Sequence, residues 1–410
     1  MSVRLTGQDW LSDPATRAVI AALEAAGGPG CARFVGGCVR NALMGQGIDD
    51  VDIATTLKPE ETKAAIETAG LKAVPTGMAH GTVTAVSARK PYEITTLRQD
   101  VSTDGRNATV AFTDDWAEDA ARRDFRLNAL YADASGEVFD PTGHGVSDAA
   151  EGRIVFVGEP ETRIREDYLR ILRFFRFYAW YGRGEPDAEA MAACAALAEG
   201  MKRLSAERVS KEMLKLLAAP DPRGAVVAMR EAGVLAQVLP EATDFPESGA
   251  TFEAMVERSP EAGMRLMALL PPDQDVVKAV AVRLRLSNAV RDRLTAAVRA
   301  WAVVDLEMTD QAARAAIYRQ GRPGFKDAVV RRWAEAADGA DAGARRLLAL
   351  ADGWTVPRLP VGGRELAQQG LEPGPETGRV LKAFEDGWIA DDFPTEGHEA
   401  RLKALITAPK

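Results

Sequence analysis

The sequence predicts an α+β head of about 150 residues, followed by an all-helical remainder. Short segments rich in Val, Ile and Thr, the composition of β-strands, are confined to the first part of the 410-residue chain, with helical segments between them. Beyond residue 150 the chain is rich in Ala and Leu at helical spacing and is interrupted by proline and glycine clusters. We therefore expect one mixed sheet with helices alongside it, and after it only helices.

The expected sheet has about five or six strands. Alternating or continuous apolar segments place these strands at residues 32–35, 50–54, 71–74, 82–87, 92–97 and 137–139. One or two helices are expected over residues 5–26, and another over 59–70. Residues 99–111 are polar and contain a glycine, so we expect a mobile loop there.

Composition indicates an ordinary globular protein of the cytoplasm. The chain is 46% apolar and 27% charged, with three cysteines, no C-x-x-C pair, no apolar run near 18 residues and no signal-peptide segment. We expect no membrane association and infer no obligate protein partner. A net charge of −9 argues against non-specific coating of nucleic acid, so any RNA contact must come from local basic patches.

The segment from Phe34 to Thr55 predicts a phosphate and metal site. A strand, the pair Gly36-Gly37 and a helix start expose backbone N–H groups to an anion. In the strand that follows, Asp50 and Asp52 point to one face about 7 Å apart. Paired carboxylates suit two Mg²⁺ ions and in-line nucleotidyl transfer. The alternative, a solvated or capping Asp-x-Asp pair, stays open.

Further polar residues extend this site. Glu93, on the strand 92–97, could add a third carboxylate, although an exposed charge on an edge strand is an equal alternative. Residues 121–130 place three arginines and Asp124 next to Phe125, Leu127 and Leu130. Arginine suits recognition of phosphate and ribose, and a solvated helix start is the alternative.

A second arginine-rich stretch spans residues 163–183. It holds six arginines and two acids among buried-type apolar residues, so its charges need partners or a ligand. Asp167 and Arg170 are three apart, which makes them neighbours on one helix face. Such an acceptor–donor pair can read the edge of cytosine or adenine and exclude guanine and uracil. An intrahelical salt bridge is the alternative.

Together these stretches resemble the family of class II CCA-adding tRNA nucleotidyltransferases and bacterial poly(A) polymerases. The similarity runs from about residue 33 to residue 217 through five motifs in order: GGCVRNALMG with DDVDIAT, RRDFRLNAL, FDPTGHGVSDAAEGRIVFVG, REDYLRILRFFRF and LSAERVSKEMLKLL. In the family these bind metal, read ribose, act as a spring between head and neck, select the base and form a neck helix. The resemblance implies a polymerase-β-like nucleotidyltransferase head.

The resemblance also implies residue roles and substrates. Asp50 and Asp52 would hold two Mg²⁺ ions, with Glu93 as a third catalytic carboxylate. The remaining implied residues bind the triphosphate (Gly36, Gly37, Arg40), the ribose (Arg123, Asp124, Asn128), the base (Asp167, Arg170) and the nucleotide from the neck (Arg173, Arg176). CTP, ATP and the 3′ end of tRNA would be the partners. Asn41 and Arg126 depart from the motifs, which usually have Asp and Thr there.

Within this family the sequence favours complete CCA addition. The stretch TGMAHGT at 76–82 is similar to the CCA-adding branch, and the strongly basic C-terminal tail expected of poly(A) polymerases is missing. Enzymes that add only CC are thought to lack the flexible loop, which the segment 98–110 resembles. Poly(A) synthesis, CC-only addition and a catalytically inactive RNA-binding protein remain the alternatives.

The predicted domain order is a catalytic head (1–152), a helical neck (153–222), a helical body (223–330) and a helical, tRNA-binding tail (331–410). The helical part has its own candidates for RNA contact, with a solvated helix face as the alternative. These are the turn 319–326 and the basic residues Lys278, Arg283, Arg285, Arg291, Arg293 and Arg299.

Overall fold

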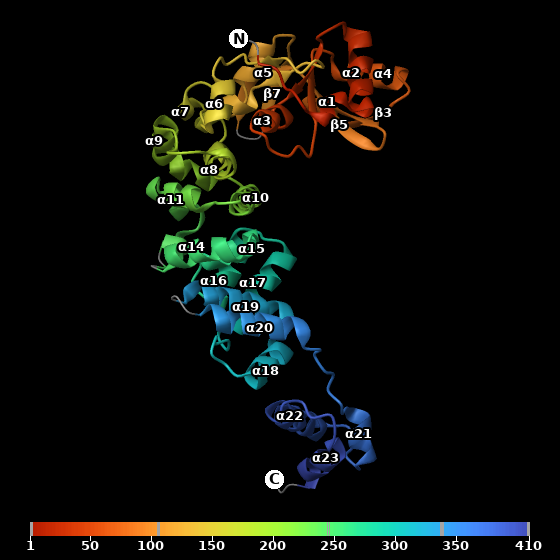
Figure 1. Cartoon of the computed structure of the whole chain (residues 1–410), viewed down its shortest axis with the longest axis vertical. Coiled ribbons are helices and arrows are strands. Elements are labelled where there is room, and N and C mark those ends of the chain that lie inside the picture. The colour runs from red at the N-terminus through yellow and green to blue at the C-terminus, as the bar shows by residue number, and fades with distance from the viewer. Residues whose placement is uncertain (1–2, 105–106, 244, 246, 337–339, 408–410) are drawn as a thin grey trace. The chain divides into compact units, whose positions relative to one another are not determined.

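The chain divides into two compact units, residues 1–240 and 241–410 (Figure 1). The computed structural model describes residues 3–104, 107–243, 245, 247–336 and 340–407. Within these ranges every strand lies in the first unit, and the second unit is helical. The predicted α+β head followed by helices is therefore confirmed. The finer division into head, neck, body and tail stays a prediction.

A seven-stranded mixed sheet forms the centre of the first unit. Its spatial order is β3 (Lys72–Gly77), β4 (Thr82–Ser87), β5 (Lys90–Thr96), β2 (Asp52–Thr55), β1 (Ala32–Val35), β8 (Tyr131–Ala132) and β9 (Val138–Phe139). Only the central neighbours β2 and β5 are parallel. Strands β1 and β4 have the predicted bounds. The sequence missed β8 because two residues are too few for an alternating pattern.

The predicted loop at 99–111 is wrong for the backbone that the structure describes. Strands β6 (Arg98–Asp104) and β7 (Asn107–Phe112) pair antiparallel in a separate two-stranded sheet. Residues 105–106 lie outside the described part. Strand pairing can overrule a polar composition, because ladder hydrogen bonds involve the backbone rather than the side chains.

Helices on the sheet agree with their sequence signals. The helices α1 (Asp9–Ser12) and α2 (Pro14–Gly27) share the predicted N-terminal segment, and α4 (Pro59–Thr68) is the predicted helix after β2. The Asp13 carboxylate accepts the Ala15 N–H at 2.9 Å and caps α2. Shorter helices complete this part of the unit: α3 (Gly37–Leu43), η1 (Met78–His80), α5 (Trp116–Ala121), η2 (Arg126–Asn128) and α6 (Gly145–Glu151).

Helices continue the first unit after residue 159. They are α7 (Pro160–Glu166), α8 (Leu169–Tyr181), α9 (Ala188–Leu197), η3 (Ala198–Arg203), α10 (Ala206–Leu217), α11 (Arg223–Glu231) and α12 (Val234–Val238). The aromatic side of α8 is buried, and its Phe174 and Phe177 rings lie 6.4 and 5.0 Å from that of Phe125. This aromatic cluster fixes α8 against the arginine-rich segment 121–130.

The second unit is built from helices throughout its described residues. They are α14 (Ser248–Arg258), α15 (Ala262–Ala268), α16 (Gln274–Arg283), α17 (Asn288–Trp301), α18 (Asp310–Gln320), α19 (Arg322–Glu335), α20 (Asp341–Gly353), α21 (Gly363–Gln368), α22 (Pro375–Ala390) and α23 (His398–Thr407), while the short α13 (Pro240–Thr243) starts at the boundary between the units. Arg331 of α19 is 1% exposed, donates to the Leu270 carbonyl at 2.9 Å and pairs with Glu335. A buried guanidinium is stable here because these acceptors replace water.

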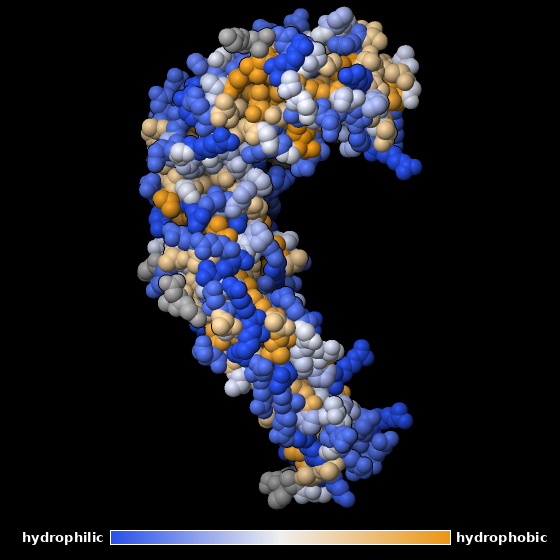
Figure 2. Space-filling model, in the orientation of Figure 1, coloured by the Kyte–Doolittle hydropathy of each residue, from blue (hydrophilic) through white to orange (hydrophobic). Residues whose placement is uncertain are grey.

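Hydrophilic residues cover most of the visible face, with apolar residues between them (Figure 2). None of the helices in the described ranges is long and apolar enough to cross a membrane. All three cysteines are buried and unpaired with one another.

Candidate active site

The glycine pair joins β1 to α3 as predicted. Gly36 has φ +69°, a backbone conformation that favours glycine, and a Cβ there would lie 3.6 Å from Arg123 Nη1. The turn therefore brings the first motif directly against the arginine-rich segment. Arg40, one turn into α3, is 6% exposed and points its guanidinium into the same region.

The acidic residues gather at one end of the central parallel pair. Asp52 opens β2, and its register partner on β5 is Glu93. The prediction that Asp50 lies in this strand is wrong, since β2 begins at Asp52 and Asp50 precedes it by two residues. Thus only Asp52 and Glu93 are held by the sheet. Asp50 joins them through the segment that leads into the strand.

The electrostatics around Asp52 fit a cation. The surrounding protein desolvates its carboxyl, although one edge stays open to solvent, and the charges of Glu93 and Asp50 add to this effect. Together they raise the pKa of Asp52 to about 6 against the pull of Arg123. In the part of the chain that the structure describes, no three acidic, histidine or cysteine groups yet converge as a metal shell. The mutual repulsion is what a bound divalent ion would relieve.

The predicted ribose residues form a buried network. Asp124 Oδ1 accepts the Phe125 N–H at 2.9 Å and Asn128 Nδ2 at 3.0 Å, while Oδ2 accepts two N–H groups of Arg173, one at 2.8 Å. Both oxygens are therefore saturated inside the protein. Burial would raise the pKa of Asp124, but Arg173 and these hydrogen bonds lower it to about 2. A direct ribose contact by Asp124 would have to replace one of these bonds.

One chain of hydrogen bonds links the glycine motif to α8. Arg40 Nη1 donates to Asn128 Oδ1 at 2.5 Å, Asn128 donates to Asp124, and Asp124 is paired with Arg173. Arg40 Nη2 also donates to the Tyr181 hydroxyl at 2.8 Å, and its guanidinium lies 4.0 Å from that ring. Thus three motifs that are distant in the sequence share one polar core.

Asp119 is the main residue that the sequence interpretation missed. It is 1% exposed and accepts from the Tyr131 hydroxyl at 2.7 Å, from Arg122 Nε at 2.8 Å and from Arg123 Nη2 at 2.9 Å. Burial opposes ionisation, but the two arginines lower the pKa of Asp119 to about 2. The signal was an acid three and four residues before two arginines, the spacing of neighbours on a helix.

The prediction that Asp167 and Arg170 share one helix face is wrong. Asp167 ends α7 with extended backbone angles, and Arg170 lies in the first turn of α8. Asp167 Oδ2 accepts Arg208 Nη2 at 2.6 Å, whereas Arg170 pairs with Glu166 and donates to the Arg163 carbonyl at 2.7 Å. The intrahelical salt bridge between the two residues is therefore wrong as well. Their role in base selection is not tested by this geometry.

The remaining neck arginine and the second motif departure have definite partners. Arg176 Nε lies 2.7 Å from a Glu212 carboxylate oxygen, and Arg126 Nη1 lies 3.8 Å from Asp148 Oδ2. Asp148 is fully buried and also binds Arg153 at 3.0 Å. Arginine at position 126 therefore adds positive charge beside a buried carboxylate, where a threonine would not.

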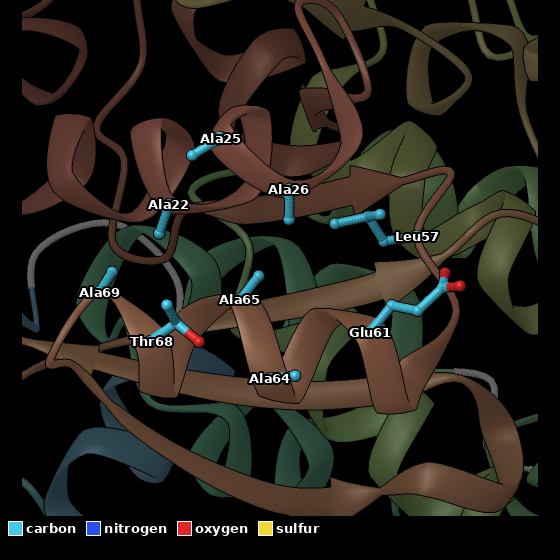
Figure 3. A pocket seen from close by; sticks show the side chains of 9 residues that line it. All are labelled: Ala22, Ala25, Ala26, Leu57, Glu61, Ala64, Ala65, Thr68 and Ala69. Atoms are coloured by element: carbon cyan, nitrogen blue, oxygen red, sulfur yellow. The ribbon is translucent and has the colours of Figure 1, made fainter.

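A cavity of about 650 Å³ between α2 and α4 shares no lining residue with the predicted site (Figure 3). Its wall is mostly alanine, with the side chains of Leu57 and Glu61 at one end (Figure 3). Such a wall offers few groups to orient a nucleotide. The polar network around Arg40 and the acidic group at β2 therefore make the better candidate site.

Acid should weaken this polar core. Because the folded-state pKa of Asp124 is about 2 and its ordinary value is 3.8, its ion pair stabilises the fold above pH 3.8 and is lost as the pH falls toward 2. We expect a loss of about 2 kcal/mol in the free energy of unfolding from this group. Urea unfolding at a series of pH values measures it. Asp124→Asn, less stable at neutral pH, should lose less over the same interval, and equal losses would contradict the assignment.

Comparisons with known proteins agree with this geometry. The family described as "Poly A polymerase head domain" matches residues 32–155, and that described as "Probable RNA and SrmB- binding site of polymerase A" matches residues 185–245. The chain is 33% identical to the mitochondrial CCA tRNA nucleotidyltransferase 1 of Mus musculus over 363 residues, which cover 85% of this chain and 81% of that protein. It is 30% identical to the CCA-adding enzyme of Levilactobacillus brevis over 374 residues, covering 89% and 90%.

A solved structure agrees as well. The Bacillus stearothermophilus CCA-adding enzyme in complex with CTP superposes with a TM-score of 0.77 at 25% identity, covering 95% of this chain and 97% of that one. Likeness over nearly the whole length in both sequence and fold leaves no large part of the chain unaccounted for. The chain belongs to the family of CCA-adding tRNA nucleotidyltransferases.

Proposed function

We propose that this protein builds or repairs the 3′-terminal CCA of tRNA from CTP and ATP without a nucleic-acid template. The observation that carries the proposal is the meeting of the acidic group at β2 and β5 with the network of Arg40, Asn128, Asp124 and Arg173, within a chain of this family. The tRNA 3′ hydroxyl attacks the α-phosphate of the nucleotide, and pyrophosphate leaves.

The family implies the use of a divalent metal ion. Two Mg²⁺ ions are our finer proposal, with Asp50 and Asp52 as ligands and Glu93 as the third carboxylate. The raised pKa of Asp52 supports this placement, because uncompensated negative charge favours a cation. Bound there, the metal would lower the pKa of the attacking hydroxyl and neutralise charge on the leaving group. No histidine base is required.

The protein's own groups bind and orient the nucleotide. Arg40 and the backbone of Gly36 and Gly37 hold the triphosphate, since Arg40 is buried with neutral partners and keeps its charge for an anion. Arg123 faces the ribose and is held in place by Asp119. Asn128 and Asp124 shape the ribose pocket, and Arg173 and Arg176 border it from α8.

Base selection is proposed to lie with Asp167 and Arg170. Each now has a protein partner, so binding of cytosine or adenine would exchange these contacts for the base edge. We expect Arg170→Ala to lower kcat/KM for CTP and ATP by about a hundredfold and to increase misincorporation of UTP and GTP. The KM for tRNA should stay within about threefold of the wild-type value. Steady-state kinetics with each nucleotide measure both effects. Equal losses with all four nucleotides, together with a weaker tRNA KM, would count against the assignment.

tRNA binding is proposed for the second unit, above all its tail from residue 331 onward. Several of the basic candidates are paired: Arg283 with Glu241, Arg291 with Asp292, and Arg293 with Glu261 and Asp327. In the turn 319–326, Arg319 pairs with Asp386 and Lys326 with Asp352. Exposed pairs of this kind are weak, so phosphates could compete for their arginines and lysines.

Product length tests the proposed function. The purified protein is given Mg²⁺ and tRNA that lacks its 3′ end, with CTP alone, ATP alone or both. We expect two additions with CTP and a third only when ATP is also present. A long ladder with ATP alone would indicate poly(A) synthesis, and arrest after two additions with both nucleotides would indicate a CC-adding enzyme. No extension under any condition would support the inactive RNA-binding alternative.

The cytoplasm is the proposed location. The three buried, unbridged cysteines are compatible with a reducing compartment. The name of the Mus musculus relative places that protein in mitochondria, so the compartment needs its own test. Cell fractionation with an antibody against the chain decides the question.

A further inference from the structure

Arg40 carries a positive charge that the protein does not neutralise. Its side-chain partners are Asn41, Asn128 and Tyr181, all of them uncharged. Among the described residues no carboxylate lies within ion-pair distance of Arg40, and the nearby Asp124 is bound to Arg173. A guanidinium that is 6% exposed and lacks a counter-ion is unusual, because burial of an unpaired charge is costly. The arrangement becomes favourable when an anion joins it.

Asn41 is bound at both ends of its amide. Its Oδ1 accepts from Arg40 Nε at 3.0 Å and from Arg40 Nη2 at 2.8 Å, while its Nδ2 donates to the Gly47 carbonyl at 2.7 Å. The orientation of the amide is determined by chemistry, because a guanidinium only donates and a carbonyl only accepts. Gly47 lies in the segment that leads from α3 to Asp50 and Asp52.

We propose that Asn41 is a positioning residue that orients Arg40 toward the nucleotide triphosphate, leaves the charge of Arg40 available, and ties it to the segment that carries the acidic residues. An aspartate, which usually stands here in the similar motif, could accept the same two bonds. It would also neutralise Arg40, and it could not donate to the Gly47 carbonyl. Only an amide meets both demands. The inference rests on the proposed function in one respect, the binding of triphosphate by Arg40.

The test replaces Asn41 by aspartate, a change of nearly equal size. Affinity for inorganic tripolyphosphate is measured by titration calorimetry, and the KM values for CTP, ATP and tRNA by steady-state kinetics. We expect Asn41→Asp to weaken tripolyphosphate binding about tenfold and to raise the KM of both nucleotides by the same factor. Since the triphosphate is common to both nucleotides, CTP and ATP must be affected equally. The tRNA KM should not change.

Two control variants separate charge from shape. Asn41→Ala removes both hydrogen bonds but leaves Arg40 charged, so tripolyphosphate affinity should fall by less than about threefold, while kcat falls because Arg40 and the segment lose their alignment. Gln46→Glu adds the same charge at an exposed position nearby and should leave tripolyphosphate affinity unchanged. Should Asn41→Asp fail to fold, a tenfold loss in Asn41→Ala would by itself overturn the charge argument.

The remaining outcomes are also decisive. Unchanged tripolyphosphate affinity in Asn41→Asp, or an equal loss in Gln46→Glu, overturns the inference while normal CCA addition by the wild-type protein leaves the proposed function intact. If the wild-type protein adds no nucleotide, the proposed function fails, yet the calorimetric comparison still tests Asn41.

Discussion

Asp52→Asn is expected to lower the rate of nucleotide addition by about a thousandfold, or about 4 kcal/mol in transition-state stabilisation. Asp52 is the carboxylate that the sheet holds beside Glu93, and its raised pKa reports the negative charge gathered around it. Asparagine keeps the shape but supplies a neutral ligand, which binds a hard divalent ion more weakly. Single-turnover extension of tRNA with CTP measures the rate.

The loss must be separated from unfolding. Removing one of three mutually repelling carboxylates should leave the thermal midpoint of the metal-free protein unchanged or higher. Asp49→Asn, the same substitution at an exposed neighbour, should retain wild-type activity. Activity of Asp52→Asn within tenfold of the wild type, at an equal thermal midpoint, would contradict the assignment of Asp52.

Asp119→Ala is expected to lower the free energy of unfolding of the first unit by about 3–5 kcal/mol. The substitution leaves Arg123 and the Tyr131 hydroxyl without their common acceptor in a buried position. The N–H of Arg98, at the start of the β6–β7 hairpin, loses its acceptor as well. Nucleotide addition should also slow, since Arg123 no longer has a fixed direction.

Native-state hydrogen exchange of peptides covering β1 and β8 reports on this unit alone. The matched control is Asp114→Ala, which removes an exposed carboxylate five residues away and should change stability by less than about 0.5 kcal/mol. Protection in Asp119→Ala equal to that of the control would mean that Asp119 does not hold the cluster together.

Much of the head could be predicted from local pattern. Strand β4 (Thr82–Ser87) alternates buried and half-buried residues along its whole length, so its bounds follow from the sequence. The glycine turn at Gly36 was predictable because few other residues adopt its backbone angles. The acidic residues were recognisable, but the start of β2 at Asp52 was not, because strand pairing rather than composition ends a strand.

The polar core depended on contacts that the sequence does not reveal. The break between α7 and α8 has no proline or glycine to mark it, and Asp167 there is held by Arg208, 41 residues away. Asp119 looks like an ordinary acid in the first turn of a short helix until Tyr131 and two arginines are seen around it. Pairings over such separations arise from tertiary packing, which overrides local signals.

The central claim is that this site adds CCA and then stops. The most direct measurement counts the nucleotides added to three forms of one tRNA, ending before CCA, after CC and after CCA, with both CTP and ATP present. The account predicts three, one and no additions. Extension of the tRNA that already ends in CCA, or failure to add a single A to the tRNA that ends in CC, would contradict it.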